Sequence, residues 1–332
     1  MIKDLYHGGA LDQMRKAFPG ALEPWVDLST GINPWPYPNT GADPAALHRL
    51  PIRTDYEDCR AAMAEAIKAP KASLLLAPGS ELLIRLLPTV IAPKRVAILN
   101  PTYGDHAEVW RASDADMIET SSPLDYTGKV DAVILCNPNN PDGRTFDRDT
   151  LCQARETLAQ RGGYLIIDEA YADLAPGVSL AHMGGAEGLI ILRSTGKFFG
   201  LAGLRLGALV APDRVLSAMI KHLGTWPVSG PALEIGARAY SDTDWHSTTR
   251  ERLARARHGL DQILTQTGLT ICGGTDLFRY VRAQYAHELW QHLARAGLYI
   301  RRFPWSDQHL RIGLPPDAEA EARLAAALTL SA

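Results

Sequence analysis

The sequence predicts an α/β protein with a largely parallel central sheet, followed by a second, smaller α+β domain. Short apolar runs alternate with helix-forming stretches through the middle of the chain, as they do where helices connect parallel strands. After Trp226-Pro227 the pattern changes to a long charged helical stretch. The length of 332 residues also suggests about two domains. We expect a large domain at 42–220, a small domain at 221–332, and an N-terminal arm, 1–41, that joins the small domain.

The elements follow in chain order from these patterns. The arm carries several prolines, which predicts irregular structure with a short strand. Apolar runs predict the strands of the central sheet: Ser73–Ala77, Arg95–Leu99, Asp131–Cys136, Tyr164–Ile167, Leu189–Leu192 and Leu206–Val210. Glu81–Thr89 and Arg148–Gln160 have the composition of connecting helices. The small domain is expected to contain a helix at Thr243–Thr265, strands at Phe278–Val281 and Leu298–Ile300, and a final alanine-rich helix.

Composition argues against several classes of protein. The formal net charge of −3 gives no reason to expect nucleic acid or an anionic membrane as a partner. No apolar stretch reaches the ~18 residues that span a bilayer, and the N-terminus lacks the apolar core of a signal peptide. The four cysteines and ten histidines show no metal-ligand spacing. We therefore expect a cytoplasmic protein with free thiols and no metal.

Polar side chains follow four of the predicted strands at their carboxyl ends, where open α/β sheets bind ligands. Tyr103 follows the second strand, Asn140 the third, Asp168 and Tyr171 the fourth, and Lys197 the fifth. An aromatic ring, an amide, a carboxylate, a phenol and an amine are thus expected at one edge of the sheet.

These residue types suit an aldehyde cofactor with a pyridine ring and a phosphate. The Lys197 amine can condense with an aldehyde, and the Ser194 hydroxyl and Arg205 can hold a phosphate. Asp168 can keep a pyridine nitrogen protonated, which makes the ring an electron sink. Backbone amides at Ser80 can bind a phosphate at the start of a helix.

Each residue also has an ordinary structural explanation. Asp168 and Ser80 could be helix N-caps, and Asn140 could be a turn residue. Tyr103 could be a core side chain, and Lys197 a solvated surface charge. The convergence of all of them on one edge favours the cofactor interpretation.

Four motifs resemble those of a known family: Asn137-x-x-Asn-Pro-x-Gly143, Asp168-x-x-Tyr171, Ser194-x-x-Lys197 and Arg205. They are similar to those of the fold-type-I pyridoxal-phosphate enzymes of the aspartate aminotransferase superfamily, and the resemblance covers nearly the whole chain. It implies pyridoxal 5'-phosphate as the cofactor, a mostly parallel seven-stranded sheet between helices, and a homodimer.

A narrower resemblance lies outside the cofactor motifs. His7-Gly8-Gly9, the segment Asp27-Leu-Ser-Thr-Gly-Ile-Asn33-Pro34, and Trp226-Pro-Val-Ser229 resemble the threonine-phosphate decarboxylases of cobalamin biosynthesis. These enzymes are related to the histidinol-phosphate aminotransferases. The implied reaction is decarboxylation of L-threonine O-3-phosphate to (R)-1-amino-2-propanol O-2-phosphate.

Carried over residue by residue, the resemblance implies a role for each motif. Lys197 would hold the cofactor and move protons, Asp168 would pair with the ring nitrogen, and Tyr103 would stack on the ring. The remaining cofactor residues would be Asn140 and Tyr171 at the ring oxygen, and Ser80, Glu81, Ser194 and Arg205 at the phosphate. The substrate residues would be His7 and Asn33 in the pocket, Arg301 at the substrate phosphate, and Arg311 at its α-carboxylate. Arg301 and Arg302 could instead be exposed charges on an edge strand.

The sequence departs from the family pattern at several positions. Gly196 stands where relatives often have a hydroxyl residue, and Asp142 replaces a threonine in a turn. Leu50 stands where relatives have a tyrosine that reaches the neighbouring subunit's cofactor; Tyr56 lies nearby in sequence. Thr275-Asp276 replaces a common Ala-Asn pair near the substrate.

Alternatives to the decarboxylase remain open. Because the same cofactor residues serve both reactions, a histidinol-phosphate or related aminotransferase is the second hypothesis. A catalytically silent relative is the third, and the retention of Lys197 argues against it. A nicotinamide-binding enzyme is disfavoured, since no G-x-G-x-x-G follows a strand.

Overall fold

The computed structural model describes residues 8–329, which form two compact units. Unit 2 comprises residues 36–140 and 144–246. Unit 1 comprises the described residues up to Trp35, the turn Pro141–Gly143, and the chain from Ser247 onward. Helix α8, Gly230–Ser241, which the predicted limit at 220/221 assigns to the small domain, packs against α3, Arg53–Ala66, in unit 2.

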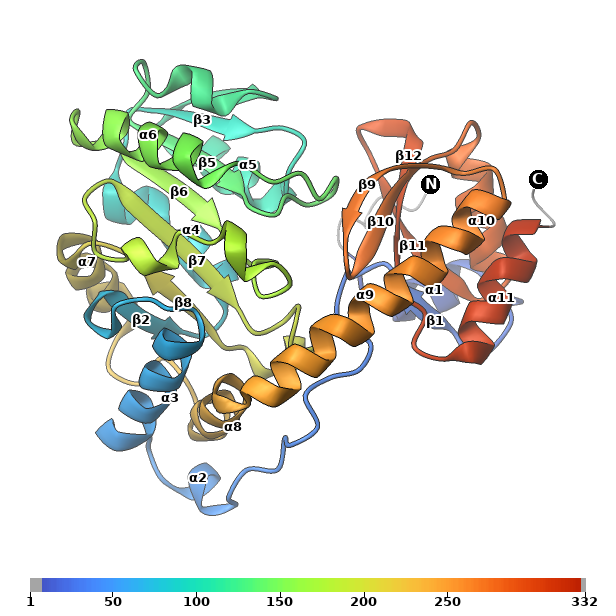
Figure 1. Cartoon of the computed structure of the whole chain (residues 1–332), viewed down its shortest axis with the longest axis horizontal. Coiled ribbons are helices and arrows are strands. Elements are labelled where there is room, and N and C mark those ends of the chain that lie inside the picture. The colour runs from blue at the N-terminus through green and yellow to red at the C-terminus, as the bar shows by residue number, and fades with distance from the viewer. Residues whose placement is uncertain (1–7, 330–332) are drawn as a thin grey trace. The chain divides into compact units, whose positions relative to one another are not determined.

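Unit 2 contains the predicted central sheet, with seven strands in the order β2-β8-β7-β6-β5-β3-β4 (Figure 1). Its strands are β2 Leu74–Ala77, β3 Arg95–Leu99, β4 Asp116–Thr120, β5 Ala132–Cys136, β6 Tyr164–Asp168, β7 Leu189–Ser194 and β8 Gly207–Val210. The pairs from β7 to β4 are parallel, and β8 is antiparallel to both of its neighbours. The α/β fold class and the largely parallel sheet are confirmed.

Burial explains which strands the apolar runs predicted. The central strands β5 and β6 are buried along their whole length, so they appear as continuous apolar runs. Strand β4 was not predicted, because it lies at the edge of the sheet and alternates between half-buried and exposed residues. An edge strand with one open side carries too few apolar residues to stand out.

Helices cover both faces of this sheet. Helices α4, Ser80–Ile91, α5, Gly104–Arg111, and α7, Asp213–Leu223, pack Leu83, Trp110 and other apolar side chains onto one face in a single core cluster. Helix α6, Arg148–Ala159, lies over the other face (Figure 1). Each fully buried leucine or isoleucine in this core contributes about 1.5–3 kcal/mol. This burial fixes the strand ends that carry the predicted site.

Unit 1 contains a five-stranded sheet in the order β1-β11-β12-β10-β9. Its strands are β1 Val26–Leu28, β9 Thr270–Thr275, β10 Phe278–Arg282, β11 Leu298–Phe303 and β12 Ser306–Gly313. Its helices are α1 Leu11–Ala17, most of α9 Thr243–Gln266, α10 Ala286–Arg295 and α11 Ala318–Thr329. Strand β11 lies between β1 and β12, and β1 pairs with its first three residues, Leu298–Ile300. Arg301 and Arg302 lie beyond that pairing, where β12 is the partner, and both are half-buried. Among residues 8–329, no helix is both long and apolar enough to cross a membrane.

The turn Pro141–Gly143 and strand β9 approach each other so closely that only glycine fits. The Gly274 N–H donates to the Asp142 carbonyl oxygen at 2.8 Å. A Cβ atom on Gly143 would lie 1.9 Å from the Gly274 oxygen, and one on Gly273 would lie 2.1 Å from the Asp142 oxygen. Gly143 has a φ of +71°, so the turn predicted for Asp142-Gly143 is present.

We expect Gly274→Ala to destabilise unit 1 by on the order of 3 kcal/mol. Gly274 has a φ of +139°, and its Cβ would lie 2.3 Å from the Phe278 carbonyl oxygen. Urea unfolding measures the loss. The control is Gly259→Ala in α9, whose Cβ would meet only Glu321 Oε1 at 3.4 Å, and which gains helix propensity. Equal urea midpoints for the two variants would contradict the close approach of Gly274 to the Phe278 carbonyl oxygen.

Candidate functional site

Four parallel strand ends meet at one edge of the sheet in unit 2. Strands β7, β6, β5 and β3 are direct neighbours, so their carboxyl ends lie side by side. Asp168 is the last residue of β6, and Ser194 is the last of β7. Tyr103 follows β3 as the N-cap of α5, and Asn140 lies in the turn after β5. The structure therefore brings together the side chains that the sequence placed at this edge.

Lys197 lies in the loop after β7 and faces Tyr171. The Lys197 Nζ atom is 5.7 Å from the centroid of the Tyr171 ring. The next two residues, Phe198 and Phe199, are fully buried and pack edge to face with each other. Trp245 stacks on Phe199 at an interplanar angle of 12°. This aromatic packing anchors the loop and leaves the half-buried amine at its surface.

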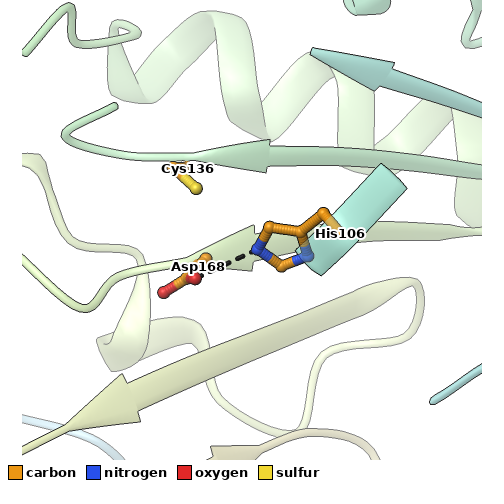
Figure 2. Close-up of side chains that lie close together, drawn as sticks. All are labelled: His106, Cys136 and Asp168. Atoms are coloured by element: carbon orange, nitrogen blue, oxygen red, sulfur yellow. Dashed lines mark hydrogen bonds and ion pairs between the residues drawn. The ribbon is translucent and has the colours of Figure 1, made fainter. Parts of the chain in front are cut away.

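Asp168 is held by a buried histidine that the sequence analysis did not identify. His106 Nε2 lies 3.0 Å from Asp168 Oδ2, and both side chains are almost fully buried (Figure 2). The other carboxylate oxygen of Asp168 accepts the Ala170 N–H at 3.0 Å. Asp168 thus also caps a backbone N–H of the following turn, in line with its structural explanation. The Cys136 thiol completes a cluster in which the ligand atoms lie within 4.8 Å of one another.

This buried cluster raises the pKa of its histidine. Burial alone would lower the pKa of His106, but hydrogen bonds to Asp168 and Cys136, together with their charges, raise it to about 10. These three ligand types could also hold a metal ion. The cluster combines residues from α5, β5 and β6, so spacing in the sequence does not reveal it.

The raised pKa of His106 predicts a loss of stability at high pH. A group whose pKa is higher in the folded state stabilises fully below its unfolded value, near 6.5, and loses that contribution as the pH rises through about 10. We expect cofactor-free wild-type protein to lose more than about 1 kcal/mol relative to His106→Gln between pH 6 and pH 10.5. Urea unfolding of both proteins measures this difference. A difference that does not change with pH would contradict the buried pair.

The start of α4 forms a cradle for an anion. Gly79, with a φ of +86°, is the N-cap of this helix and makes no side-chain capping bond. The guanidinium of Arg205 lies over it, since a Cβ on Gly79 would be 2.7 Å from Arg205 Nη2. A Cβ on Gly207 would likewise lie 2.7 Å from the Ser80 amide nitrogen, so a side chain here would crowd the start of the helix. A helix N-terminus and an arginine attract phosphate strongly.

Arg205 has an unusual backbone conformation at this cradle. Its φ of +54° places a non-glycine residue in the left-handed region, which costs energy. Its Nη1 donates to the Ala202 carbonyl at 3.1 Å, and its Nη2 lies 3.9 Å from the exposed carboxylate of Glu81. Ser194 Oγ accepts the Gly196 N–H at 3.2 Å nearby in the chain. Strain retained beside clustered groups that suit a phosphate supports a functional site.

The turn after β5 is held by two of its three asparagines. Asn137 Oδ1 accepts the Phe146 N–H at 3.0 Å, and Asn139 Oδ1 accepts from the Thr102 hydroxyl at 2.7 Å. Both are fully buried, so the turn explanation applies to them. Asn140 is half-buried at the rim, which is consistent with contact to a bound ring.

The predicted substrate residues lie in unit 1. Arg311 on β12 is buried, donates from Nη2 to the Ser29 carbonyl at 2.5 Å, and lies 4.9 Å from the Phe278 ring centroid. Asn33 is buried, and its Oδ1 accepts the Trp35 N–H at 2.9 Å. The guanidinium of Arg301 lies 5.8 Å from the Phe303 ring centroid. His7 lies outside the described residues.

The departures from the family pattern have structural explanations. Leu50 is 60% exposed. The Tyr56 hydroxyl accepts the Leu76 N–H of its own chain at 2.9 Å, so Tyr56 is engaged in holding β2. Asp276 pairs with Arg257 at 3.1 Å. A Cβ on Gly196 would lie 3.3 Å from Ser194 Oγ, so a larger residue here would crowd that hydroxyl.

Two features of this region were missed at the level of the sequence. His106 lies three residues after Tyr103 at the start of a helix, a spacing that places both on one face. The second is a buried ion network around Arg193, which follows four apolar residues in β7. An arginine in such a run requires buried partners, and that requirement was the available signal.

Comparisons with known proteins agree with this geometry. The family described as aminotransferase class I and II matches residues 43–328. A threonine-phosphate decarboxylase of Sinorhizobium sp is 40% identical over 330 residues, which cover 99% of this chain and 98% of that relative. A threonine-phosphate decarboxylase of Pseudomonas aeruginosa is 37% identical over 326 residues, covering 98% and 97%. Histidinol-phosphate aminotransferase from Sinorhizobium meliloti, solved in complex with pyridoxal-5'-phosphate, has a TM-score of 0.79 at 18% identity, covering 96% of this chain and 93% of that one.

Proposed function

The chain belongs to the class I and II aminotransferase family, and on this premise we propose that it decarboxylates L-threonine O-3-phosphate. The product would be (R)-1-amino-2-propanol O-2-phosphate, an intermediate of cobalamin biosynthesis. One observation carries the proposal. The similarity to two threonine-phosphate decarboxylases extends over 98–99% of this chain, including the N-terminal segment outside the family match.

The enzyme uses pyridoxal phosphate, and the residues in unit 2 fit this cofactor. When bound, the cofactor accepts electrons from bonds at the substrate Cα. The cradle of Gly79, Ser80 and Arg205 suits its phosphate, with Ser194 in the adjoining loop. Asp168, held by His106, suits the pyridine nitrogen.

The chain's own residues supply binding and proton transfer. The Asp168 carboxyl group, held by His106 at 3.0 Å, would pair with the ring nitrogen and keep a proton on it. Tyr103 would cover the ring face, and Asn140 and Tyr171 would bind the ring oxygen. The Lys197 amine would hold the cofactor through its aldehyde until the amine of the substrate displaces it. The freed amine would then be placed to return a proton to the substrate Cα.

Orientation of the substrate selects the bond that breaks. The bond held perpendicular to the cofactor ring is weakened most, and distant binding contacts set that alignment. We assign the substrate carboxylate to Arg311, because its planar guanidinium suits a carboxylate, and the substrate phosphate to Arg301. The resemblance to the decarboxylases adds His7 and Asn33 as further substrate residues. An aminotransferase would hold Cα–H in that position and is the alternative.

We further propose that the enzyme is a cytoplasmic homodimer. Leu47, Leu50 and Ile52 are 74%, 60% and 53% exposed, and three large apolar side chains this close in sequence favour a protein contact. Light scattering is expected to give about twice the 36.2 kDa of one chain, and Leu47→Asp to lower that mass. A wild-type mass of one chain would refute the dimer.

The product assay tests the activity. Protein, pyridoxal phosphate and L-threonine O-3-phosphate are mixed without a 2-oxo acid, and CO₂ and the amine are followed. We expect catalytic CO₂ release. Turnover only when a 2-oxo acid is supplied, or amino transfer from histidinol phosphate to 2-oxoglutarate without CO₂ release, would assign the aminotransferase reaction instead.

A further inference from the structure

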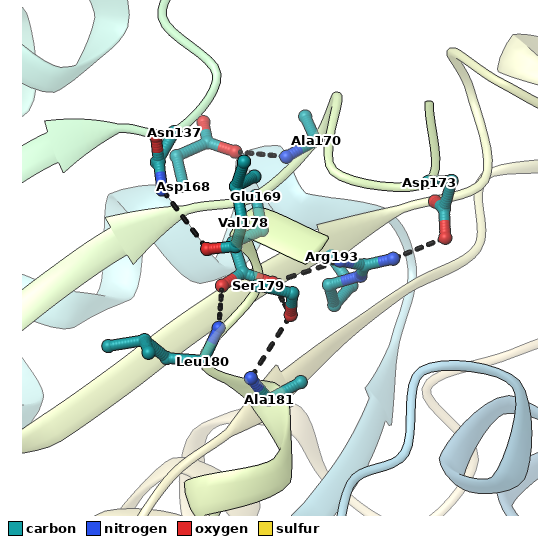
Figure 3. Close-up of polar contacts among 10 residues, drawn as sticks. All are labelled: Asn137, Asp168, Glu169, Ala170, Asp173, Val178, Ser179, Leu180, Ala181 and Arg193. Carbon is teal, nitrogen blue, oxygen red and sulfur yellow. Dashed lines mark hydrogen bonds and ion pairs between the residues drawn. The ribbon is translucent and has the colours of Figure 1, made fainter. Parts of the chain in front are cut away.

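A buried arginine links the two loops that carry Tyr171 and Lys197. Arg193 on β7 is 2% exposed, and its Nη1 lies 2.9 Å from Glu169 Oε2 (Figure 3). Its Nη2 forms an ion pair with Asp173 Oδ1. Glu169 is fully buried and Asp173 is 7% exposed. One guanidinium thus joins two carboxylates from the loop after β6.

Two residues of the network are direct sequence neighbours of residues in the cofactor site. Asp168 is followed by Glu169, and Arg193 is followed by Ser194. Successive side chains of a strand point to opposite faces, so each site residue has a network residue as its neighbour on the other face. The Glu169 N–H donates to the Leu192 carbonyl at 2.9 Å, which extends the pairing of β6 and β7 to this point.

The two carboxylates mark the ends of a short turn. Glu169 begins it, Asp173 ends it, and Tyr171 lies between them. Lys197 follows Arg193 by four residues and has its amine 5.7 Å from the Tyr171 ring centroid. The Nη1 and Nη2 atoms of Arg193 therefore bind the first and last residues of the turn 169–173, which carries Tyr171. The backbone that follows Arg193 leads to Lys197.

Further hydrogen bonds fix the carboxylate of Glu169. The Ser179 hydroxyl donates to its Oε2 at 2.5 Å, and the Leu180 N–H donates to its Oε1 at 2.9 Å. The Ala181 N–H donates in turn to Ser179 Oγ at 3.1 Å. Burial raises the pKa of Glu169, and the charge of Arg193 opposes that rise. These contacts give the carboxylate a single position.

Stability alone does not account for such a network. Replacing a buried ion triad by apolar residues of similar volume is often neutral or stabilising, because desolvating the charges costs as much as their attraction returns. Charged groups with directional bonds instead define geometry. The placement behind Tyr171 and Lys197 shows which geometry they define.

We propose that Arg193, Glu169 and Asp173 are positioning residues that fix the Tyr171 turn relative to the Lys197 loop. This inference rests on the cofactor roles proposed for Tyr171 and Lys197. The network does not touch cofactor or substrate; it acts through the backbone segments that carry the two residues. Its contribution is to the rate of the chemical step and to the electronic environment of the cofactor, with substrate binding left largely unchanged.

Arg193→Lys tests the proposal in the holoenzyme. Lysine keeps the positive charge, but its single ammonium group cannot bind both carboxylates in the same geometry. We expect the pH midpoint of the cofactor's visible absorption to shift by at least half a unit. We expect kcat to fall by about 10-fold or more, with KM within about threefold, since small misplacements near the chemistry are costly. Ser179→Ala removes only one bond to Glu169 and is expected to shift the midpoint less, in the same direction.

The matched control is Arg279→Lys in unit 1. Arg279 makes a two-pronged pair with Asp261 at 2.5 and 2.7 Å, and its side chain is 14% exposed. It is expected to lower the melting temperature without moving the absorption midpoint or kcat. If the Arg193 and Ser179 variants behave like this control, the network is merely structural and the proposal is overturned. Should Arg193→Lys fail to fold, an unchanged midpoint in Ser179→Ala overturns it.

The absorption readout separates this inference from the proposed reaction. It needs bound pyridoxal phosphate but no substrate turnover, so it stands even if wild-type protein releases no CO₂. In that case kcat is taken from the aminotransferase assay. Absence of visible absorption in the wild type would instead remove the proposed cofactor roles, and the positioning inference with them.

Discussion

Lys197→Ala is expected to abolish the visible absorption of bound cofactor and to lower turnover by about 10³-fold or more. Lys197 carries the amine of the loop after β7 and faces Tyr171 across 5.7 Å. The fold should survive, because the loop is anchored by the buried Phe198 and Phe199 and not by the amine. Circular dichroism and the melting temperature verify the fold, and absorption and CO₂ release measure the effect.

The control for this experiment is Lys221→Ala, which removes an exposed amine from the last turn of α7. It should leave both absorption and turnover unchanged. Near-normal turnover in Lys197→Ala would show that another group carries the chemistry. Loss of the fold in that variant would show that the loop depends on the amine, contrary to the packing described above.

Asp168→Asn should give the second largest effect, a fall in kcat of about 10³-fold. The amide preserves the shape of the side chain and can still accept from the Ala170 N–H, but it has no charge to keep a proton on the pyridine nitrogen. Loss of that charge also removes one cause of the raised pKa of His106. Steady-state kinetics and a pH titration of stability measure the two consequences together.

Asp213→Asn serves as the control, since Asp213 is an exposed carboxylate in the first turn of α7. It removes the same charge without touching the site. If Asp168→Asn retains a kcat within about threefold of the wild type, the carboxylate does not stabilise the ring proton and the residue is chiefly a cap of the turn at Ala170.

The sequence predicted the strands that are buried on both faces, because such strands appear as continuous apolar runs. Strands β5 and β6 are buried on both faces and were found as apolar runs. Strand β9 contains Gly273 and Gly274, and β12 begins with polar residues, so neither shows the period of a half-buried strand. Their pairing with β10 depends on long-range contacts that a local pattern does not contain.

The sequence predicted the site residues that end or follow strands, but not those that depend on buried partners. Asp168 and Ser194 end their strands, and Tyr103 lies in the loop after β3, so one topological rule placed them together. His106 and Arg193 were missed because their importance depends on partners in other elements. The role of a buried charge can be inferred only when its counter-charge is known. The counter-charges of Arg193 are Glu169 and Asp173, which follow a different strand, β6.

The anion cradle has a consequence for how the enzyme is made in the cell. Gly79 and Ser80 emerge from the ribosome early, but Arg205 and Gly207 are synthesised only after β3 to β7. Strand β2 likewise waits for β8 to pair with it. Long-range pairings of this kind form slowly and leave apolar surface exposed meanwhile. A nascent chain therefore has no complete anion cradle until most of unit 2 has been translated, so any ligand of the cradle can stabilise the chain only late in folding.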